Sequence, residues 1–515
     1  MAPRTFRPDA GFNPTVFYGA IGLIGALLAS ALLNLDKAEA TFLLIQRYAA
    51  LNFGWFLILT ANILLIACVY LAAGSLGSVR LGGREARPEF STPAWFAMLF
   101  SAGMGIGLLF YGVAEPVSHF AHPPLSHFSA PHAETAVKLA GNAQHAMGLT
   151  YLHWGLHAWA IYVIIALGLA YVSFNRGTTL SIGAFLHQLW PNLPRIIVDL
   201  VDILAVVATV CGVASSLGFG ASQINAGLTF LFGTGDTIAA KFVIIAIVTG
   251  LATLSVALGL TRGIKWLSLA NMTLAVALAL FLLFAGPTVF LLDSFIQNLG
   301  YYVQRFIYLS TWTESYTGGK WQLDWTIFYY AWWISWSPFV GIFIARISYG
   351  RTVRQFVLGT LLVPVLFTFI WMTIFGDSAL YIELFGDGGI AEAVARSMPD
   401  ALFALLGHYP LTHALSALAI VIVATFFVTS ADSGALVVAM IASGGSHEAG
   451  FAPRVTWAIA MGVLAGGLMF AGGLSALQTA AIITGLPFAV VLLIIAGGTV
   501  RMIGQDLQAP SPARG

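Results

Sequence analysis

Charged residues are scarce in this chain: only 8% of its 515 residues are Asp, Glu, Lys or Arg, whereas 59% are hydrophobic. A soluble globular domain carries about 25% charged residues. The 22 basic and 21 acidic side chains leave a net charge of +1, so the chain lacks the basic surplus that nucleic-acid binding requires. The composition predicts an integral membrane protein and excludes a nucleic-acid partner.

Cysteine is almost absent as well, and no soluble domain, linker or low-complexity segment interrupts the apolar runs. The two cysteines, Cys68 and Cys211, lie inside such runs, which is typical of small buried side chains and not of a disulfide or a metal site. The first run, 17–35, is close to transmembrane length, which favours a membrane span over a cleaved signal peptide. Any function is therefore expected among the spans.

Apolar windows of about 19 residues predict an all-α membrane protein with twelve transmembrane helices. The spans are expected at 15–34, 51–75, 93–114, 145–173, 197–220, 237–260, 265–291, 326–346, 355–376, 411–433, 453–472 and 476–499. We expect one membrane domain over 1–515, with two N-terminal helices in 1–92, repeats in 93–291 and 326–499, and a short cytoplasmic tail in 500–515.

The distribution of basic residues predicts the orientation of these spans. With the N-terminus inside, most of the 22 Lys and Arg fall in the inner connections, as expected of cytoplasmic loops. Both termini are therefore expected in the cytoplasm. Two outer connections, 301–309 and 390–406, are long enough to form amphipathic helices along the membrane surface.

Two predicted spans contain helix-breaking residues at membrane depth. In 101–107, Gly103, Gly105 and Gly107 each reduce helix stability by about 1 kcal/mol relative to alanine, and in the eighth span Pro338 removes a backbone hydrogen bond. Close packing of small residues is the alternative for a single glycine motif. Two breaks five spans apart are typical of transporters with inverted repeats, which bind substrate and coupling ions at the breaks.

Aromatic residues gather in the fourth and eighth spans. They are Trp154, Trp159 and Tyr162 in the former and Trp332, Trp333 and Trp336 in the latter. Tryptophans of membrane proteins usually form interfacial belts, but both clusters lie well inside their spans. Ring faces attract a quaternary ammonium group by about 0.5–2 kcal/mol each, so the clusters are a candidate cage for such a substrate.

Acidic residues at depth are limited to Glu115, Asp202 and Asp432. An intramembrane acid is a functional candidate, but all three lie near span ends, where hydrogen bonds to loops or helix termini are the expected role. His153 and His157 lie one helical turn apart with no acid or cysteine nearby in the sequence to complete a metal site.

The tenth span carries a cluster of hydroxyl groups. It reads TFFVTSADS from Thr425 to Ser433. Hydroxyl and carbonyl oxygens suit a dehydrated sodium ion, and the alternative is that these hydroxyls bond back to their own helix.

Taken together, these motifs resemble the betaine/choline/carnitine transporter family from about residue 13 to 499. The resemblance is carried by GMGIG at 103–107, YGVAEP at 111–116, HWGLH at 153–157, DWTIFYYAWWISWSPF at 324–339, ARIS at 345–348 and TSADS at 429–433. It implies twelve spans with two inverted five-helix repeats after two extra helices, a LeuT-like fold, and a homotrimer.

The resemblance also implies the site residues. The aromatic box corresponds to Trp154, Trp159, Tyr162 and Trp333, and the inner part of the substrate path to Trp332, Trp336 and Phe339. The backbone of Ala102, Gly103, Met104 and Gly105 would contact the substrate carboxylate. One sodium site matches Ala102, Met104, Phe426, Thr429 and Ser430, and a second matches Thr209 and the position of Val213. Val213 departs from the hydroxyl of sodium-coupled members, and Tyr330 departs from the usual tryptophan.

We therefore expect a secondary active transporter, not an enzyme, that imports glycine betaine or a related solute with sodium as the coupling ion and no other cofactor. It would lie among the lipids of the bacterial inner membrane. A proton-coupled choline transporter would resemble family members with an aspartate at Gly107, and a sodium-independent carnitine or betaine exchanger those with a cation in the fifth span. This chain has no Lys or Arg between Arg195 and Lys241. The alternative from another class is a channel, which does not need a closed cage.

Overall fold

The computed structural model describes residues 12–33, 35–103, 105–124, 135–258, 261–445 and 450–508. Over these ranges the chain is helical without strands, and the single β-bridge joins Arg80 to Thr352. Ten helical segments of the described chain are long and apolar enough to cross a membrane. The predicted all-α membrane class is confirmed for these residues.

The first half of the chain forms α1 (Pro14–Leu32), α2 (Leu35–Ala73), the 3-10 turn η1 (Ser75–Ser78), α3 (Thr92–Gly103), α4 (Ile106–Ala121), α5 (Thr135–Trp154), α6 (Leu156–Arg176), α7 (Ile182–Leu189), α8 (Arg195–Phe232), α9 (Ile238–Leu258) and α10 (Thr261–Ala285). The second half forms α11 (Thr288–Thr311), α12 (Trp321–Asp324), α13 (Thr326–Arg346), α14 (Val353–Met372), the π-helical turn η3 (Thr373–Asp377), α15 (Ser378–Phe385), α16 (Ile390–Arg396), the 3-10 turn η4 (Met398–Asp400), α17 (Ala401–Gly407), α18 (Thr412–Ala442) and α19 (Phe451–Gln508).

Each predicted span coincides with helix, but some boundaries differ. The two spans predicted at 453–472 and 476–499 are merged in α19, whose backbone leaves the helical region only at Gly472 and Gly473. Since α19 continues to Gln508, the tail expected from residue 500 is helical up to that point. The third predicted span is divided between two short helices, α3 and α4. The number of twelve crossings and the two inverted repeats stay predictions.

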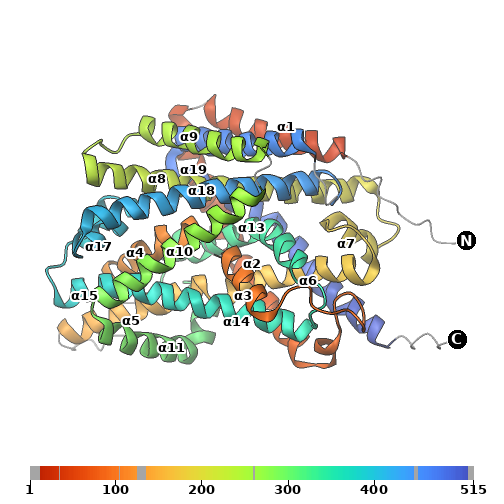
Figure 1. The fold of residues 1–515 in the computed structure, drawn as a ribbon, viewed down its shortest axis with the longest axis horizontal. Coiled ribbons are helices and arrows are strands. Elements are labelled where there is room, and N and C mark those ends of the chain that lie inside the picture. The colour runs from red at the N-terminus through yellow and green to blue at the C-terminus, as the bar shows by residue number, and fades with distance from the viewer. Residues whose placement is uncertain are drawn as a thin grey trace, which may run out of the picture.

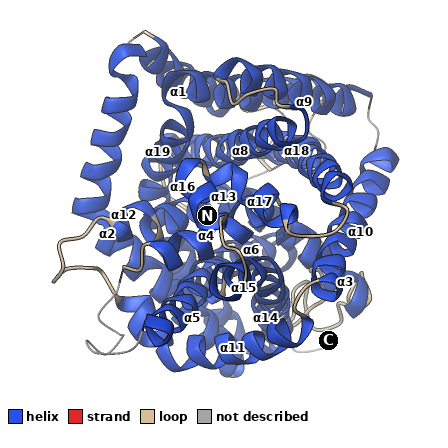
Figure 2. Ribbon diagram, turned by 90° about the vertical axis from the view of Figure 1, so that its left-hand side faces the viewer, coloured by secondary structure: helices blue, strands red, loops and turns tan. Residues whose placement is uncertain are grey.

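Helix α13 lies at the centre of the bundle, with α1, α2, α9, α10 and α11 around it (Figure 2). Nearly all of its side chains are buried, whereas α9 exposes Ile247, Leu251 and Leu254 by more than half. These residues share one helix face and form the kind of apolar exterior that contacts lipid. The start of α1 and the end of α19 lie toward the same end of the molecule (Figure 1).

The break predicted in the third span is confirmed: α3 ends at Gly103, and α4 begins at Ile106 after an extended Gly105. The break predicted at Pro338 is wrong, because α13 continues through it. The hydroxyl of Ser337 donates a hydrogen bond of 2.7 Å to the carbonyl of Ile334, the group that loses its N–H partner to the proline ring. A local side chain thus satisfies the helix and removes the need for a break.

A break that the sequence analysis missed separates α5 from α6 at Gly155, which has φ −96° and ψ −137°. A β-carbon at Gly155 would lie 3.0 Å from the ring of Phe369. The glycine therefore permits close approach of α14 to the junction. The predicted outer helices are present in part of α11 and in α16 and α17.

Candidate functional site

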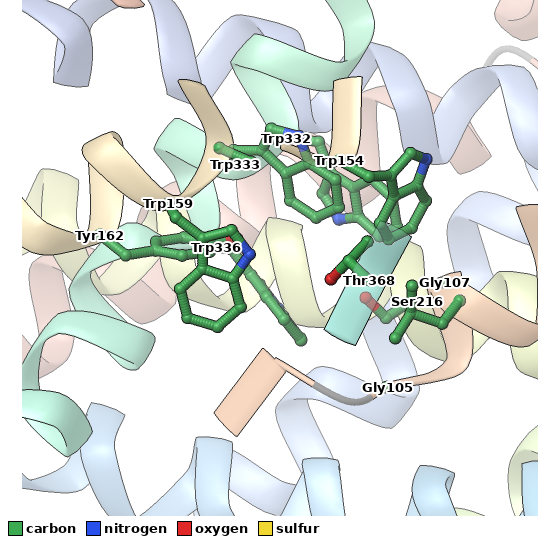
Figure 3. Close-up of a pocket in the computed structure, with 12 residues that line it drawn as sticks. Gly105, Gly107, Trp154, Trp159, Tyr162, Ser216, Trp332, Trp333, Trp336 and Thr368 are labelled. Carbon is green, nitrogen blue, oxygen red and sulfur yellow. The ribbon is translucent and has the colours of Figure 1, made fainter. Parts of the chain in front are cut away.

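A cavity lies at the junction of α4, α5, α6, α8, α13 and α14 (Figure 3). It contains about 450 Å³ of space not filled by protein atoms, including the part that opens to solvent. It is lined by Gly105, Gly107, Leu108, Trp154, Ala158, Trp159, Tyr162, Ser216, Trp332, Trp333, Trp336 and Thr368. Every member of the two predicted aromatic clusters is in this lining.

The aromatic rings meet at several angles around the cavity. Trp332 and Trp333 stack with their centroids 4.7 Å apart, and Trp154 stands at 71° to Trp333 with a centroid distance of 4.9 Å. On the other flank Trp159 and Tyr162 meet at 86° and 5.7 Å. Since all these side chains are buried, the interfacial-belt alternative does not apply to them.

Three of the indoles are held by hydrogen bonds from their N–H groups. Trp333 donates to the carbonyl of His153 at 2.9 Å, and Trp332 donates to the carbonyl of Gly212 at 3.3 Å. Trp154 donates to the Glu115 carboxylate at 2.7 Å. His153 lies in the last turn of α5, where helix carbonyls lack partners from the helix itself. The break at Gly155 thus supplies the acceptor that orients Trp333.

Two polar groups in the lining have no partner among the described residues. They are the hydroxyl of Tyr162 and the indole N–H of Trp336. Buried polar groups are nearly always hydrogen-bonded. Both groups are therefore available to a ligand in the cavity.

Glycines allow the indoles to approach α4 and α8. A β-carbon at Gly107 would lie 2.9 Å from a ring carbon of Trp154 and 3.0 Å from one of Trp332, and a β-carbon at Gly212 would lie 2.9 Å from Trp336. Gly105 has an extended backbone, which any residue can adopt, and it marks the point at which α4 starts. The glycines set the width of the cavity.

Among the other predicted substrate residues, Gly105 is in the lining and Phe339 lies beside it. Phe339 is partly buried and contacts Trp336 with a centroid distance of 5.6 Å. Ala102 and Gly103 end α3, but their side-chain surroundings lie outside the described residues. Met104 lies outside the described residues entirely. The backbone contact to a carboxylate therefore stays a prediction.

The predicted sodium ligands are placed only in part. The hydroxyl of Thr429 bonds back to the carbonyls of Thr425 and Phe426 at 3.0 and 3.2 Å, which is the alternative considered for this cluster. Ser430 is half-buried on the same helix, α18. Because Met104 is not described, the first sodium site stays a prediction.

The second predicted sodium site lies on α8. Thr209 is buried, and its hydroxyl has no hydrogen-bond partner among the described residues. Val213, one turn later, lies against Gly434 of α18 and offers no oxygen. The second sodium site also stays a prediction.

The role expected for Glu115 is wrong, whereas that of Asp202 is confirmed. Asp202 accepts a hydrogen bond of 2.9 Å from the backbone of Gly183, in the first turn of α7. Glu115 instead contacts side chains of the bundle core, including His153 at 2.6 Å. His153 therefore does have an acid beside it, contrary to the sequence analysis. The one-turn spacing of Glu115 and His119 on α4 was the sequence signal that Glu115 contacts a side chain and not a helix terminus.

An apolar-faced helical bundle with a buried aromatic cavity beside a helix break has the architecture of a secondary transporter. The family model for betaine/carnitine/choline family transporters matches residues 15–508. The chain belongs to this family, and it is an integral membrane transporter and not an enzyme.

Individual relatives agree with this assignment. The glycine betaine transporter of Acinetobacter baylyi is 42% identical over 100% of this chain and 77% of its own length. The glycine betaine transporter OpuD of Bacillus subtilis is 42% identical over 96% of this chain and 94% of its own. The high-affinity choline transport protein of Escherichia coli is 39% identical over 96% of this chain and 73% of its own.

The contacts at Gly107 lead to a stability prediction. Gly107→Ala should displace Trp154 or Trp332, and overpacking of this kind costs about 1–3 kcal/mol. We expect a lower melting temperature and an altered near-ultraviolet circular dichroism spectrum in detergent. Gly250→Ala is the control, because its β-carbon would meet nothing within 4 Å. Equal spectra and melting temperatures for both variants would contradict the prediction.

Proposed function

We propose that this transporter imports glycine betaine, or a related trimethylammonium or sulfonium solute, by sodium-coupled symport. The observation that carries the substrate class is the buried aromatic lining of the cavity. A trimethylammonium group cannot donate a hydrogen bond, and each ring face stabilises it by about 0.5–2 kcal/mol. The names of the relatives, which include glycine betaine and choline transporters, support the same class.

A second feature of the cavity, the start of α4 beside Gly105, supports a substrate that also carries a carboxylate. The N-terminus of α4 begins there after Gly105, which provides no side-chain cap. Free backbone N–H groups and the helix dipole favour an anion at such a position. The unpartnered N–H of Trp336 and hydroxyl of Tyr162 are further donors. Choline has no carboxylate to use these groups.

The space around Gly107 also favours betaine over proton-coupled choline transport. The resemblance associates proton-coupled choline carriers with an aspartate at this position. Here even a β-carbon would lie within 3.0 Å of Trp154 and Trp332. An aspartate would have no room unless both rings moved.

Sodium coupling is the finer part of the proposal. The hydroxyl of Thr209 is buried without a partner among the described residues, and the described residues of α8 carry no cation between Arg195 and Phe232. An uncharged oxygen such as this hydroxyl suits a sodium ion. Because α8 has no cationic side chain there, no fixed positive charge takes the place of sodium. Because Val213 has no hydroxyl, we expect the second site to be weak and the Hill coefficient for sodium to be nearer one than two.

We further propose a bacterial inner-membrane location with both termini in the cytoplasm. The bias of Lys and Arg along the sequence supports this orientation, and the start of α1 and the end of α19 lie toward the same end of the bundle. A homotrimer is proposed on the family resemblance alone.

The aromatic cavity is tested by Trp333→Leu. Loss of one ring face and of its anchored geometry should raise the betaine concentration for half-maximal uptake at least tenfold, about 1.4 kcal/mol. Uptake of labelled glycine betaine into proteoliposomes is the measurement. Trp266→Leu is the control, because Trp266 is 71% exposed on α10. Unchanged uptake in Trp333→Leu would remove the cage from the mechanism.

Sodium coupling is tested by replacing Thr429 and Ser430 together with alanine. The sodium concentration for half-maximal uptake should rise at least tenfold, about 1.4 kcal/mol. Thr273→Ala is the control, since its exposed hydroxyl only bonds back to Leu269 on α10. If betaine accumulates equally well without sodium under a proton gradient alone, the sodium assignment fails.

A further inference from the structure

The Glu115 side chain is completely buried within α4 and is surrounded by hydrogen-bond donors. One carboxylate oxygen lies 2.6 Å from Nδ1 of His153 and 3.3 Å from Nε2 of His119. The other accepts a hydrogen bond of 2.7 Å from Nε1 of Trp154 and one from the hydroxyl of Tyr329. A carboxylate with two donors on each oxygen is satisfied in its ionised form.

The far sides of the two histidines are consistent with neutral rings. Nδ1 of His119 lies 3.3 Å from Nε1 of Trp321, and since an indole N–H can only donate, this Nδ1 accepts and Nε2 carries the proton toward Glu115. Nε2 of His153 lies 2.9 Å from the hydroxyl of Thr326, which can donate in the same way. The contact to Trp321 makes His119 neutral, and with His153 in the same form the network carries one net negative charge, that of Glu115.

Glu115, His119 and His153 also have the residue types of a zinc site, and their facing atoms lie within 4.8 Å of one another. The second oxygen of Glu115 already accepts hydrogen bonds from Trp154 and Tyr329, and the three side chains are fully buried. A catalytic or exchangeable metal needs an open position. The arrangement fits a hydrogen-bonded network better than a metal site.

This network is connected to the cavity through two of its tryptophans. Trp154 donates its N–H directly to Glu115, and Trp333 donates to the backbone carbonyl of His153, whose ring contacts Glu115. Tyr329, the fourth donor, stacks on Trp333 at 26° with a centroid distance of 5.8 Å. The carboxylate is therefore bonded directly to one ring of the cavity lining, Trp154, and is linked through His153 and Tyr329 to a second, Trp333.

We propose that the buried charge of Glu115 makes the cavity selective for a cationic trimethylammonium group over a neutral group of the same shape. A hydrogen bond from an indole N–H to a carboxylate polarises the ring, which makes its face more attractive to a cation. The charge also attracts the cation directly through a poorly polarisable interior. Glu115 does not line the cavity itself and acts on the ligand both through Trp154 and through its charge. The inference rests on the proposed substrate class.

The test compares glycine betaine with 3,3-dimethylbutanoate, in which carbon replaces the quaternary nitrogen and the shape is retained. Dissociation constants of both compounds are measured on the purified full-length protein, the second by displacement of labelled glycine betaine. In Glu115→Gln we expect the affinity for glycine betaine to fall at least tenfold and that for 3,3-dimethylbutanoate to change less than threefold. The preference for the charged ligand should therefore shrink.

Asp202→Asn is the matched control, because Asp202 is another buried acid whose described hydrogen bond goes to the backbone of Gly183 and not to the cavity. It should leave the preference unchanged. Glu115→Asp retains the charge and should retain the preference within twofold, even if both affinities fall. If Glu115→Gln does not fold, Glu115→Asp still tests the inference, because loss of the preference for glycine betaine in this variant would overturn it.

The remaining outcomes separate this inference from the proposed function. Equal losses for both ligands in Glu115→Gln, or no loss for either, would overturn the role of the charge and leave Glu115 as a packing residue. Suppose that the unaltered protein binds tetramethylammonium but not glycine betaine, and that Glu115→Gln weakens the binding of tetramethylammonium. The substrate assignment then fails, while the role of Glu115 stands.

Discussion

The hydrogen bond from the Trp333 indole to the carbonyl of His153 joins the two features on which the cavity depends. A helix that ends inside a membrane leaves carbonyls that lipid cannot satisfy, so protein groups must do so. At the end of α5 the acceptor is used to fix an aromatic ring of α13. At Pro338 the same requirement is met locally by Ser337, and there the helix does not open.

The same constraint explains the hydrogen-bonded network around Glu115. Glu115 could not stay charged in the bundle without donors, because an isolated carboxylate is very costly to bury. The donors come from α4, α5 and α13, so these helices are held together where their aromatic side chains meet the cavity. Stability of the bundle and geometry of the cavity therefore depend on the same contacts.

The sequence predicted the helical class, the break after Gly103 and the residues of the aromatic lining, because each has a local signal in composition or periodicity. It missed the break at Gly155, since one glycine in an apolar run is a weak signal. It also placed a break at Pro338 that a neighbouring hydroxyl makes unnecessary. The contact between Glu115 and His153 joins residues on different helices, and spacing along the chain does not say which helices are neighbours.

Helix α4 gives the cavity a polarity that suits a zwitterion. Its N-terminus, next to Gly105, has the positive end of the helix dipole, and Glu115 lies nine residues beyond Ile106, about 13 Å along the axis. Trp154 lines the cavity and bonds to that carboxylate. A dipolar ligand can therefore align between the two ends without a direct ion pair. A direct ion pair between a buried charge and the substrate would be costly to break. Because a transporter must release its substrate in every cycle, an indirect interaction suits transport better.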